Sequence, residues 1–119
     1  MNRRDVDLGV TIFEELPDGR LFHLGYWLGR ASFASDRTTR RLLTPGRTTR
    51  IPFETNVVSR LLGAGSRLLL VADVDKNEFA QVNYGTGRDV SDESAADAGD
   101  PLVVRWHARS YVDVPMDRR

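Results

Sequence analysis

The sequence predicts an all-β protein, a β-sandwich or jelly roll, on three observations. A strand–turn–strand pattern stands near the N-terminus, an unbroken apolar run occupies residues 66–74, and several shorter extended segments are bounded by turn residues. Six or seven short strands with turns between them are typical of this fold class. Because 119 residues suit one domain and no linker divides them, we expect residues 1–119 to form a single domain.

The first two strands are predicted to form a β-hairpin. In residues 8–16, Leu8, Val10 and Ile12 fall on one side of an extended chain, and Glu14 is next in that row. The tripeptide 17–19, Pro-Asp-Gly, is a turn signature in which proline presets φ and glycine takes a positive φ. Residues 20–31 form the second predicted strand, and two strands joined by such a turn predict a hairpin.

The middle of the chain is predicted to contain a loop, a strand, a helical turn and a central strand. Residues 32–50 form the loop and 48–57 the third strand, followed by one helical turn over 57–62 that the glycines of 63–65 end. The apolar run 66–74 suits a central strand covered on both faces. A helix is the competing interpretation, but the flanking glycines and the polar residues 73–77 favour a strand and then a turn.

The last third combines an acidic loop with short strands. Residues 79–84 are predicted to be extended, and 85–100 form the loop, with a helical turn over 91–98 that Ser91 and Ser94 can cap. Two closing strands are expected at 101–108 and 110–114, the second ended by Pro115.

Composition narrows the classes of partner. The 17 basic and 17 acidic residues cancel, which argues against a nucleic-acid partner. Cysteine is absent, so disulfides and thiolate chemistry are excluded. No apolar run approaches the ~20 residues of a bilayer span, and residues 1–5 do not begin a signal peptide. We therefore expect a cytoplasmic protein without a membrane partner.

Nucleophilic catalysis has little support in the sequence. The nucleophile elbow Gly-x-Ser-x-Gly does not occur, and its nearest approach, residues 63–67, has no glycine after Ser66. The two histidines, His23 and His107, each fall inside a predicted strand, where a structural role or simple exposure is the favoured interpretation. We predict no catalytic residue and no independent enzyme.

Metal and phosphate sites are weighed against ordinary loops. Two histidines without cysteine make a poor transition-metal set. A hard-cation site is considered in the acidic loop, although the EF-hand spacing is missing and a solvated loop is favoured; its carboxylates are Asp89, Asp92, Glu93, Asp97 and Asp100. Residues 85–88, Gly-Thr-Gly-Arg, lack the glycines, lysine and helix of a phosphate-binding fingerprint. We expect no cofactor and no metal.

A basic loop follows the hairpin. It contains one nearby aromatic residue, Phe33, and five arginines: Arg37, Arg40, Arg41, Arg47 and Arg50. A nucleic-acid site is one interpretation. Because the net charge is zero, a solvated loop or a contact with another domain is favoured.

Several short motifs together resemble one family. In chain order they are Asp5-Val6-Asp7-Leu8, Leu16-Pro17-Asp18-Gly19-Arg20, Leu28-Gly29-Arg30-Ala31-Ser32, Leu43-Thr44-Pro45-Gly46, Gly65-Ser66-Arg67-Leu68, Asn83-Tyr84-Gly85-Thr86-Gly87 and Ser110-Tyr111-Val112-Asp113-Val114-Pro115. Their order and spacing, over nearly the whole chain, resemble the C-terminal non-catalytic domain of the X-Pro dipeptidyl-peptidase and cocaine-esterase family of serine hydrolases.

The resemblance implies a jelly-roll β-sandwich like a galactose-binding domain. It also implies a partner, an α/β-hydrolase domain in cis or in trans, which carries a Ser-Asp-His triad and cleaves esters or amides. Because that triad belongs to the other domain, the resemblance assigns no catalytic residue to this chain. Its expected function is that of an accessory domain that supports the catalytic domain or its oligomer.

Two departures from the family pattern bear on assembly. The hydrolase domain is not in the sequence, and only residues 1–4 precede the strand that begins near Asp5, where the family has further strands. Loss of those strands should leave a sheet edge uncovered, so we expect self-association through that edge.

The alternative function is a free-standing carbohydrate- or ligand-binding β-sandwich. Such a site needs exposed aromatic residues beside polar loops, and the candidates are Trp27, Tyr84 and Trp106. Core packing is the favoured interpretation of both tryptophans.

Overall fold

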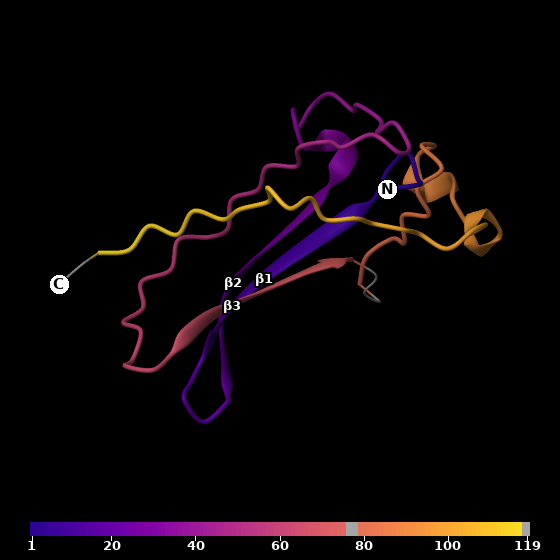
Figure 1. The fold of residues 1–119 in the computed structure, drawn as a ribbon. Helices are drawn as coiled ribbons and strands as arrows, with labels where there is room; N and C mark the ends of the chain where they lie inside the picture. The colour runs from indigo at the N-terminus through magenta and orange to yellow at the C-terminus, as the bar shows by residue number, and fades with distance from the viewer. Residues whose placement is uncertain (76–78, 118–119) are drawn as a thin grey trace.

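The computed structural model describes residues 1–75 and 79–117. Its regular structure is an antiparallel sheet in the order β2-β1-β3, formed by β1 (Asp7–Glu15), β2 (Leu21–Arg30) and β3 (Arg67–Val74) (Figure 1). The described residues contain no α-helix, only the short 3-10 turns η1 (Ala31–Phe33), η2 (Val90–Asp92) and η3 (Ala95–Asp97). The all-β prediction is confirmed, and the strands of the described residues make one open sheet.

The predicted hairpin is confirmed. The Leu16 amide donates to the Arg20 carbonyl at 2.9 Å, and the Gly19 amide donates to the Leu16 carbonyl at 2.9 Å. Asp18 also accepts from the Arg20 amide at 3.0 Å, the local bond by which aspartate favours turns. β1 and β2 are antiparallel, with Asp7 opposite Arg30 at the far end and Glu15 opposite Leu21 beside the turn.

A β-bulge in β2 changes which side chains share a face. Ile12 lies opposite Gly25, but the next residue, Phe13, lies opposite His23, so Leu24 is the extra residue. One extra residue reverses the alternation beyond it. His23 therefore joins Tyr26 on one face, although three positions separate them.

One face of the sheet is covered by the loops. This covered face contains Leu8, Val10, Ile12 and Glu14 of β1 with their partners on β2 and β3. Phe53 packs on Trp27 with ring centroids 5.6 Å apart, and the partly buried Leu102 packs on the core formed by Val6, Leu8 and Ala31. Residues from the 43–63 and 101–117 segments thus lie over this face, and both segments run above the sheet in Figure 1.

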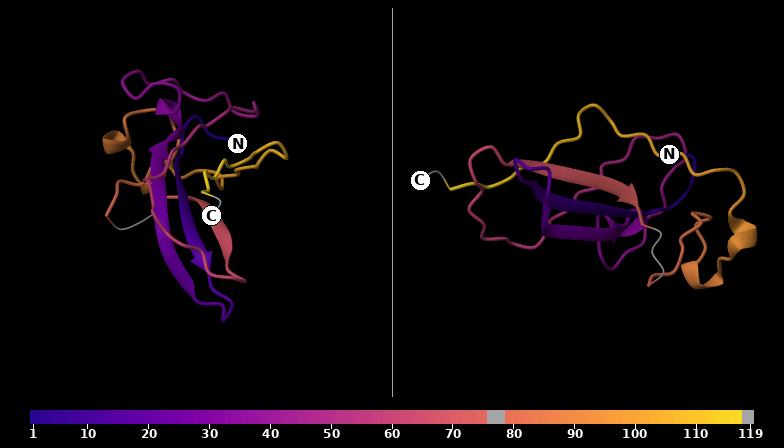
Figure 2. Two further views of the ribbon diagram at one scale, coloured as in Figure 1. Left: turned by 90° about the vertical axis from the view of Figure 1, so that its left-hand side faces the viewer. Right: turned by 90° about the horizontal axis from the view of Figure 1, so that it is seen from below.

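The other face carries apolar side chains that remain exposed. We call it the open face; the register places on it Thr11, Phe13, Leu21, His23, Tyr26, Leu28, Leu69 and Val71. Leu21, Tyr26, Leu28 and Val71 are exposed. Figure 2 shows the three strands side by side when the sheet is seen from below.

The place predicted for the apolar run is wrong. Residues 67–74 are a strand, as expected, but β3 lies at an edge of the sheet and β1 is the central strand. β3 is exposed or half-buried along its length, so it is not covered on both faces. The turn predicted after it includes residues 76–77, which lie outside the described residues.

The remaining predicted strands and the helical turn are also wrong. Residues 48–57, 79–84, 101–108 and 110–114 pair with no strand of the described residues. Pro52 stands in the middle of the first segment, where it lacks the amide that a ladder needs. Residues 57–62 form no helix, because Arg60 and the Gly63 amide both bond to Glu14 and tie this segment to the sheet.

The molecule exposes more surface than a self-contained domain of its mass. Its accessible surface is 9107 Å², about 2,600 Å² above the value of ~6,500 Å² expected for a 13.4 kDa monomer. Its radius of gyration is 16.6 Å, against ~13.5 Å for a compact domain of 119 residues. No helix among the described residues is long and apolar enough to span a membrane.

Candidate functional site

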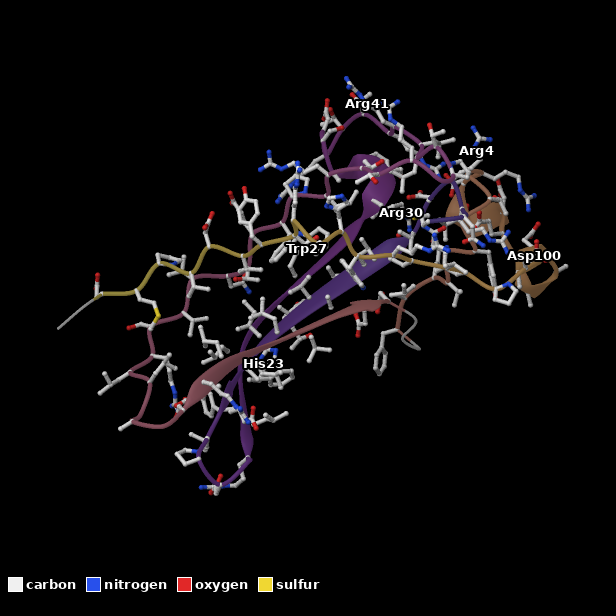
Figure 3. All side chains as sticks on the ribbon, viewed as in Figure 1. Arg4, His23, Trp27, Arg30, Arg41 and Asp100 are labelled. Carbon is white, nitrogen blue, oxygen red and sulfur yellow. The ribbon has the colours of Figure 1, made fainter. Side chains whose placement is uncertain are left out.

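The open face is an aromatic and aliphatic surface built by the bulge. The Phe13 and His23 rings meet edge to face with centroids 5.6 Å apart, and His23 lies 6.3 Å from the Tyr26 ring. Figure 3 shows His23 below the sheet and Trp27 above it. Tyr26 is 57% exposed and Leu28 46% exposed, so both are available to a partner.

Ion pairs stand at both ends of the open face. Arg67 donates to the two Glu15 carboxylate oxygens at 2.9 and 3.0 Å, beside the hairpin turn. At the other end Arg30 donates to both Asp7 oxygens at 2.8 and 3.0 Å, and this contact raises the pKa of Arg30. The open face is therefore an apolar surface with charged ends, the arrangement typical of a protein interaction site.

Residues 1–7 join three distant segments at one end of the sheet. We call this set of contacts the N-terminal hub. Asn2 bonds with Pro101 and Val103 at 2.9 Å each, while the Arg4 amide donates to the Gly85 carbonyl at 3.0 Å. Arg3 donates to the carbonyls of Ala98 and Asp100. Figure 3 shows Arg4, Arg30 and Asp100 toward this end of the molecule.

Asp5 is the buried centre of the hub. Its side chain is fully buried and accepts from the Ser32 amide at 3.0 Å, the Ser32 hydroxyl at 2.7 Å and Arg40 at 3.1 Å. The Val6 amide donates a fourth bond at 2.9 Å. Asn83 reaches the neighbouring Asp7 at 2.9 Å. These contacts fix the entry to β1 against the exit from β2, which is a structural role.

Ser66 faces a carboxylate rather than a histidine. Its hydroxyl is buried beside Glu14, whose carboxylate binds Arg60 at 2.8 Å. The nearby Ser66 hydroxyl, then Arg60, hold the pKa of Glu14 below its ordinary value. Glu14 belongs to the covered face and His23 to the open face, so the sheet separates Ser66 from His23. His107 accepts from the Arg109 amide through Nδ1 at 3.2 Å.

The acidic loop uses its carboxylates to hold its own backbone. Glu93 accepts from the Tyr84 amide at 2.6 Å and the Thr86 amide at 2.9 Å. Within the described ranges no three carboxylates or histidines gather as a metal-binding group. Gly85 takes part in the hub through its carbonyl, and the loop 85–88 folds against residues 3–5.

Two helical turns replace the single one expected in this loop. Ser94 is the N-cap residue of η3, as predicted, and its amide donates to Asp97 at 2.8 Å. The cap expected from Ser91 is wrong, because Asp89 accepts from the Ser91 amide at 3.0 Å.

The arginines of the basic loop lie in different environments: one has a structural role, and three others surround a hollow. Arg40 bonds to buried Asp5. Arg41, Arg47 and Arg50 line a hollow of about 360 Å³ together with threonines of the same loop. Arg37 is exposed.

The three aromatic candidates for a binding platform lie in different environments. Trp27 packs on Phe53 over the covered face. Tyr84 is half-buried beside the hub. Trp106 is 56% exposed.

Comparison with models of protein families and with curated proteins finds no match for this chain.

The open face is the feature that sequence reasoning missed. Regular alternation along β2 would place Leu28, Tyr26, Leu24 and Phe22 on one face and His23 on the other. Gly25 in the middle of the strand is the available signal, since an isolated glycine in a strand suggests a bulge.

Proposed function

We propose that this chain is a non-catalytic accessory domain that docks on an α/β-hydrolase catalytic domain through the open face. The proposed parent enzyme is an acyl hydrolase like the X-Pro dipeptidyl-peptidases and cocaine esterases, and its proposed location is the cytoplasm. The observation that carries the proposal is the exposure of apolar side chains along one whole face of the sheet.

The size of the uncovered surface supports a large partner. Monomers rarely expose contiguous apolar patches beyond a few hundred Å². Permanent complexes bury ~2,000–5,000 Å² in total, or ~1,000–2,500 Å² on each partner, and the surplus of about 2,600 Å² on this one chain is comparable to the upper end of that share. Docking of the open face on another domain would remove part of this surplus from water, which stabilises both domains.

The motifs behind the family resemblance also support the proposal. Five side chains from three separate motifs meet in or beside the N-terminal hub: Asp5, Asp7, Arg30, Ser32 and Asn83. The motifs therefore form one structural unit. Their role is to hold the loops against the sheet, in keeping with an accessory domain.

A jelly-roll sandwich is the proposed complete fold. Phe53 and Leu102 already lie over the covered face, in segments predicted as strands. The packing of these two side chains on the sheet supports a second layer on this face. We propose that these segments form the second layer of the sandwich when the domain is docked, like a galactose-binding domain.

The docking test uses a catalytic domain of this hydrolase class from which its own C-terminal domain has been removed. We expect the added chain to raise the melting temperature of that domain and its hydrolysis of a chromogenic short-chain ester and an Xaa-Pro arylamide. The variant Leu28→Glu, on the open face, should lose both effects. The matched variant Leu61→Glu changes a leucine that is 78% exposed outside that face and should keep them.

A chain that neither binds nor stabilises such a domain would contradict the docking proposal. The chain alone should hydrolyse neither substrate. Its control is a variant with Ser66, His23 and His107 replaced; activity of the unmodified chain that disappears in this variant would contradict the non-catalytic assignment.

A second candidate is a free-standing carbohydrate-binding module, which the exposure of Trp106 favours. Aromatic side chains in such sites stack on sugar rings through their apolar faces. Saturable quenching of tryptophan fluorescence by an oligosaccharide, lost in Trp106→Ala, would support this candidate. A tryptophan fluorescence that does not change as the oligosaccharide is added would exclude this candidate.

A further inference from the structure

The outer edge of β3 has backbone groups that nothing in the described residues pairs. The Asp75 amide donates to the Asp7 carbonyl at 2.8 Å. Every second residue of β3, counted back from Asp75, therefore directs its amide and carbonyl toward β1. The alternate residues direct theirs outward: Leu68, Leu70, Ala72 and Val74. Across residues 1–75 and 79–117, no backbone hydrogen bond reaches this edge from another segment.

This edge lacks the features that usually prevent pairing with another strand. Natural edge strands are interrupted by proline, by an inward-pointing charge or by a bulge. Residues 68–72 read Leu-Leu-Leu-Val-Ala, and their pairing with β1 is regular. The charges stand outside this run, with Arg67 before it and Asp73 after it.

We propose that the β3 edge binds the β3 edge of a second copy of this chain, antiparallel, about a two-fold axis at Leu70. The outward groups of Leu70 then pair with those of Leu70 in the partner, and those of Leu68 pair with Ala72. Leu69 lies opposite Val71, and Arg67 lies opposite Asp73. Every outward group from Leu68 to Ala72 is satisfied in this register.

Charge complementarity selects this arrangement. Arg67 and Asp73 are both exposed and both belong to the open face, so the two-fold axis brings opposite charges together at each end of the pair. Directly opposite cross-strand charges stabilise antiparallel pairs. A two-fold axis at Val71 would place Leu69 opposite the Asp73 carboxylate, an apolar group against a charge.

The product is a continuous sheet in the order β2-β1-β3-β3-β1-β2. An axis perpendicular to the sheet keeps the two open faces on the same side. The dimer therefore does not occupy the docking surface of the proposed function but extends it. Because no hydrolase domain takes part in this pairing, the test of the dimer is independent of the test of the proposed function.

The first experiment measures mass in solution by light scattering at micromolar concentration. We expect twice the chain mass of 13.4 kDa. Asp73→Arg should shift the mass to that of the monomer, because it places Arg67 opposite a second cation; Asp113→Arg makes the same charge change away from β3 and should leave the dimer intact. Ala72→Pro removes one outward amide and should also give the monomer, with circular dichroism to check its folding.

The second experiment fixes the register by cross-linking. The chain has no cysteine, so a single introduced thiol reports only its own position. Leu70→Cys should form a covalent dimer on oxidation or with a short thiol cross-linker, while Arg20→Cys at the hairpin turn should not. A wild-type chain that is monomeric, or a dimer that persists in Asp73→Arg, would overturn the proposal. Cross-linking of Val71→Cys in preference to Leu70→Cys would overturn it as well.

Discussion

At the scale of single residues, buried carboxylates hold the structure together. Asp5 and Glu14 are each 1% exposed and accept bonds from segments far away in the chain. A buried carboxylate is costly unless several donors surround it, and removal of the acceptor leaves those donors without a partner. These two side chains therefore carry much of the link between loops and sheet.

Asp5→Ala is expected to lower the free energy of unfolding by about 3 kcal/mol, because Ser32 and Arg40 lose their buried acceptor. Urea denaturation followed by circular dichroism measures the change. Asp113→Ala, at an exposed position, should stay within about 0.5 kcal/mol of the wild type. Equal effects of the two variants would contradict the buried role of Asp5.

Glu14 gives a pH dependence of stability. Ser66 and then Arg60 lower the pKa of Glu14 in the folded chain below the ordinary value of 4.5. A group whose pKa is lower in the folded state stabilises it above the unfolded pKa, and this stabilisation is lost as pH falls through the folded pKa. The stability difference between wild type and Glu14→Gln should therefore be full at pH 7 and shrink below about pH 4.5. A stability difference between the two proteins that stays constant from pH 7 to about pH 3 would contradict this role of the Glu14 carboxylate.

At the scale of elements, the hairpin and the loop at Gly85 follow different rules. The hairpin forms from neighbouring residues, so the turn 17–19 and the alternation on each side suffice to predict it. The loop 83–87 is held by Arg4 and Asp7, about eighty residues away in the chain. Its conformation depends on contacts that no local pattern indicates.

Gly85→Ala and Gly19→Ala separate the two effects. Both glycines have positive φ, 76° and 83°, so each substitution costs ~1–2 kcal/mol of backbone strain. A Cβ at Gly19 meets nothing within 4 Å, whereas one at Gly85 would lie 2.6 Å from the Asp5 carbonyl oxygen. Gly85→Ala should cost a further ~1–3 kcal/mol in thermal or urea unfolding. Equal losses would mean that the Gly85 contact is not tight.

At the scale of the whole molecule, the chain has more apolar surface than its own core can bury. Among the described residues, the buried apolar side chains are Val6, Leu8, Val10, Ala31 and Val90. Hydrophobic stabilisation grows with the apolar area removed from water. Because this core is small, it contributes little hydrophobic stabilisation to the fold. The docking and pairing proposals each supply a surface that covers part of the remainder.

The monomeric variant Asp73→Arg should be extended in solution. X-ray scattering should give a radius of gyration near the 16.6 Å of the structure rather than ~13.5 Å, the value of a compact domain of this length. The 50 Å long axis of the molecule is the physical cause. A radius close to the compact value would show that the loops pack into a self-contained domain without a partner.

The sequence by itself determined the β class, the hairpin with its turn, the strand at 67–74 and the capping role of Ser94. Each depends on residues close together in the chain, where alternation and turn chemistry decide the outcome. Only the tertiary structure decided that β1 is central and β3 an edge, that a bulge at Leu24 places His23 beside Tyr26, and that Asp5 gathers Ser32 and Arg40. Pairing order, register and long-range hydrogen bonds depend on which distant segments meet, and no local spacing encodes that.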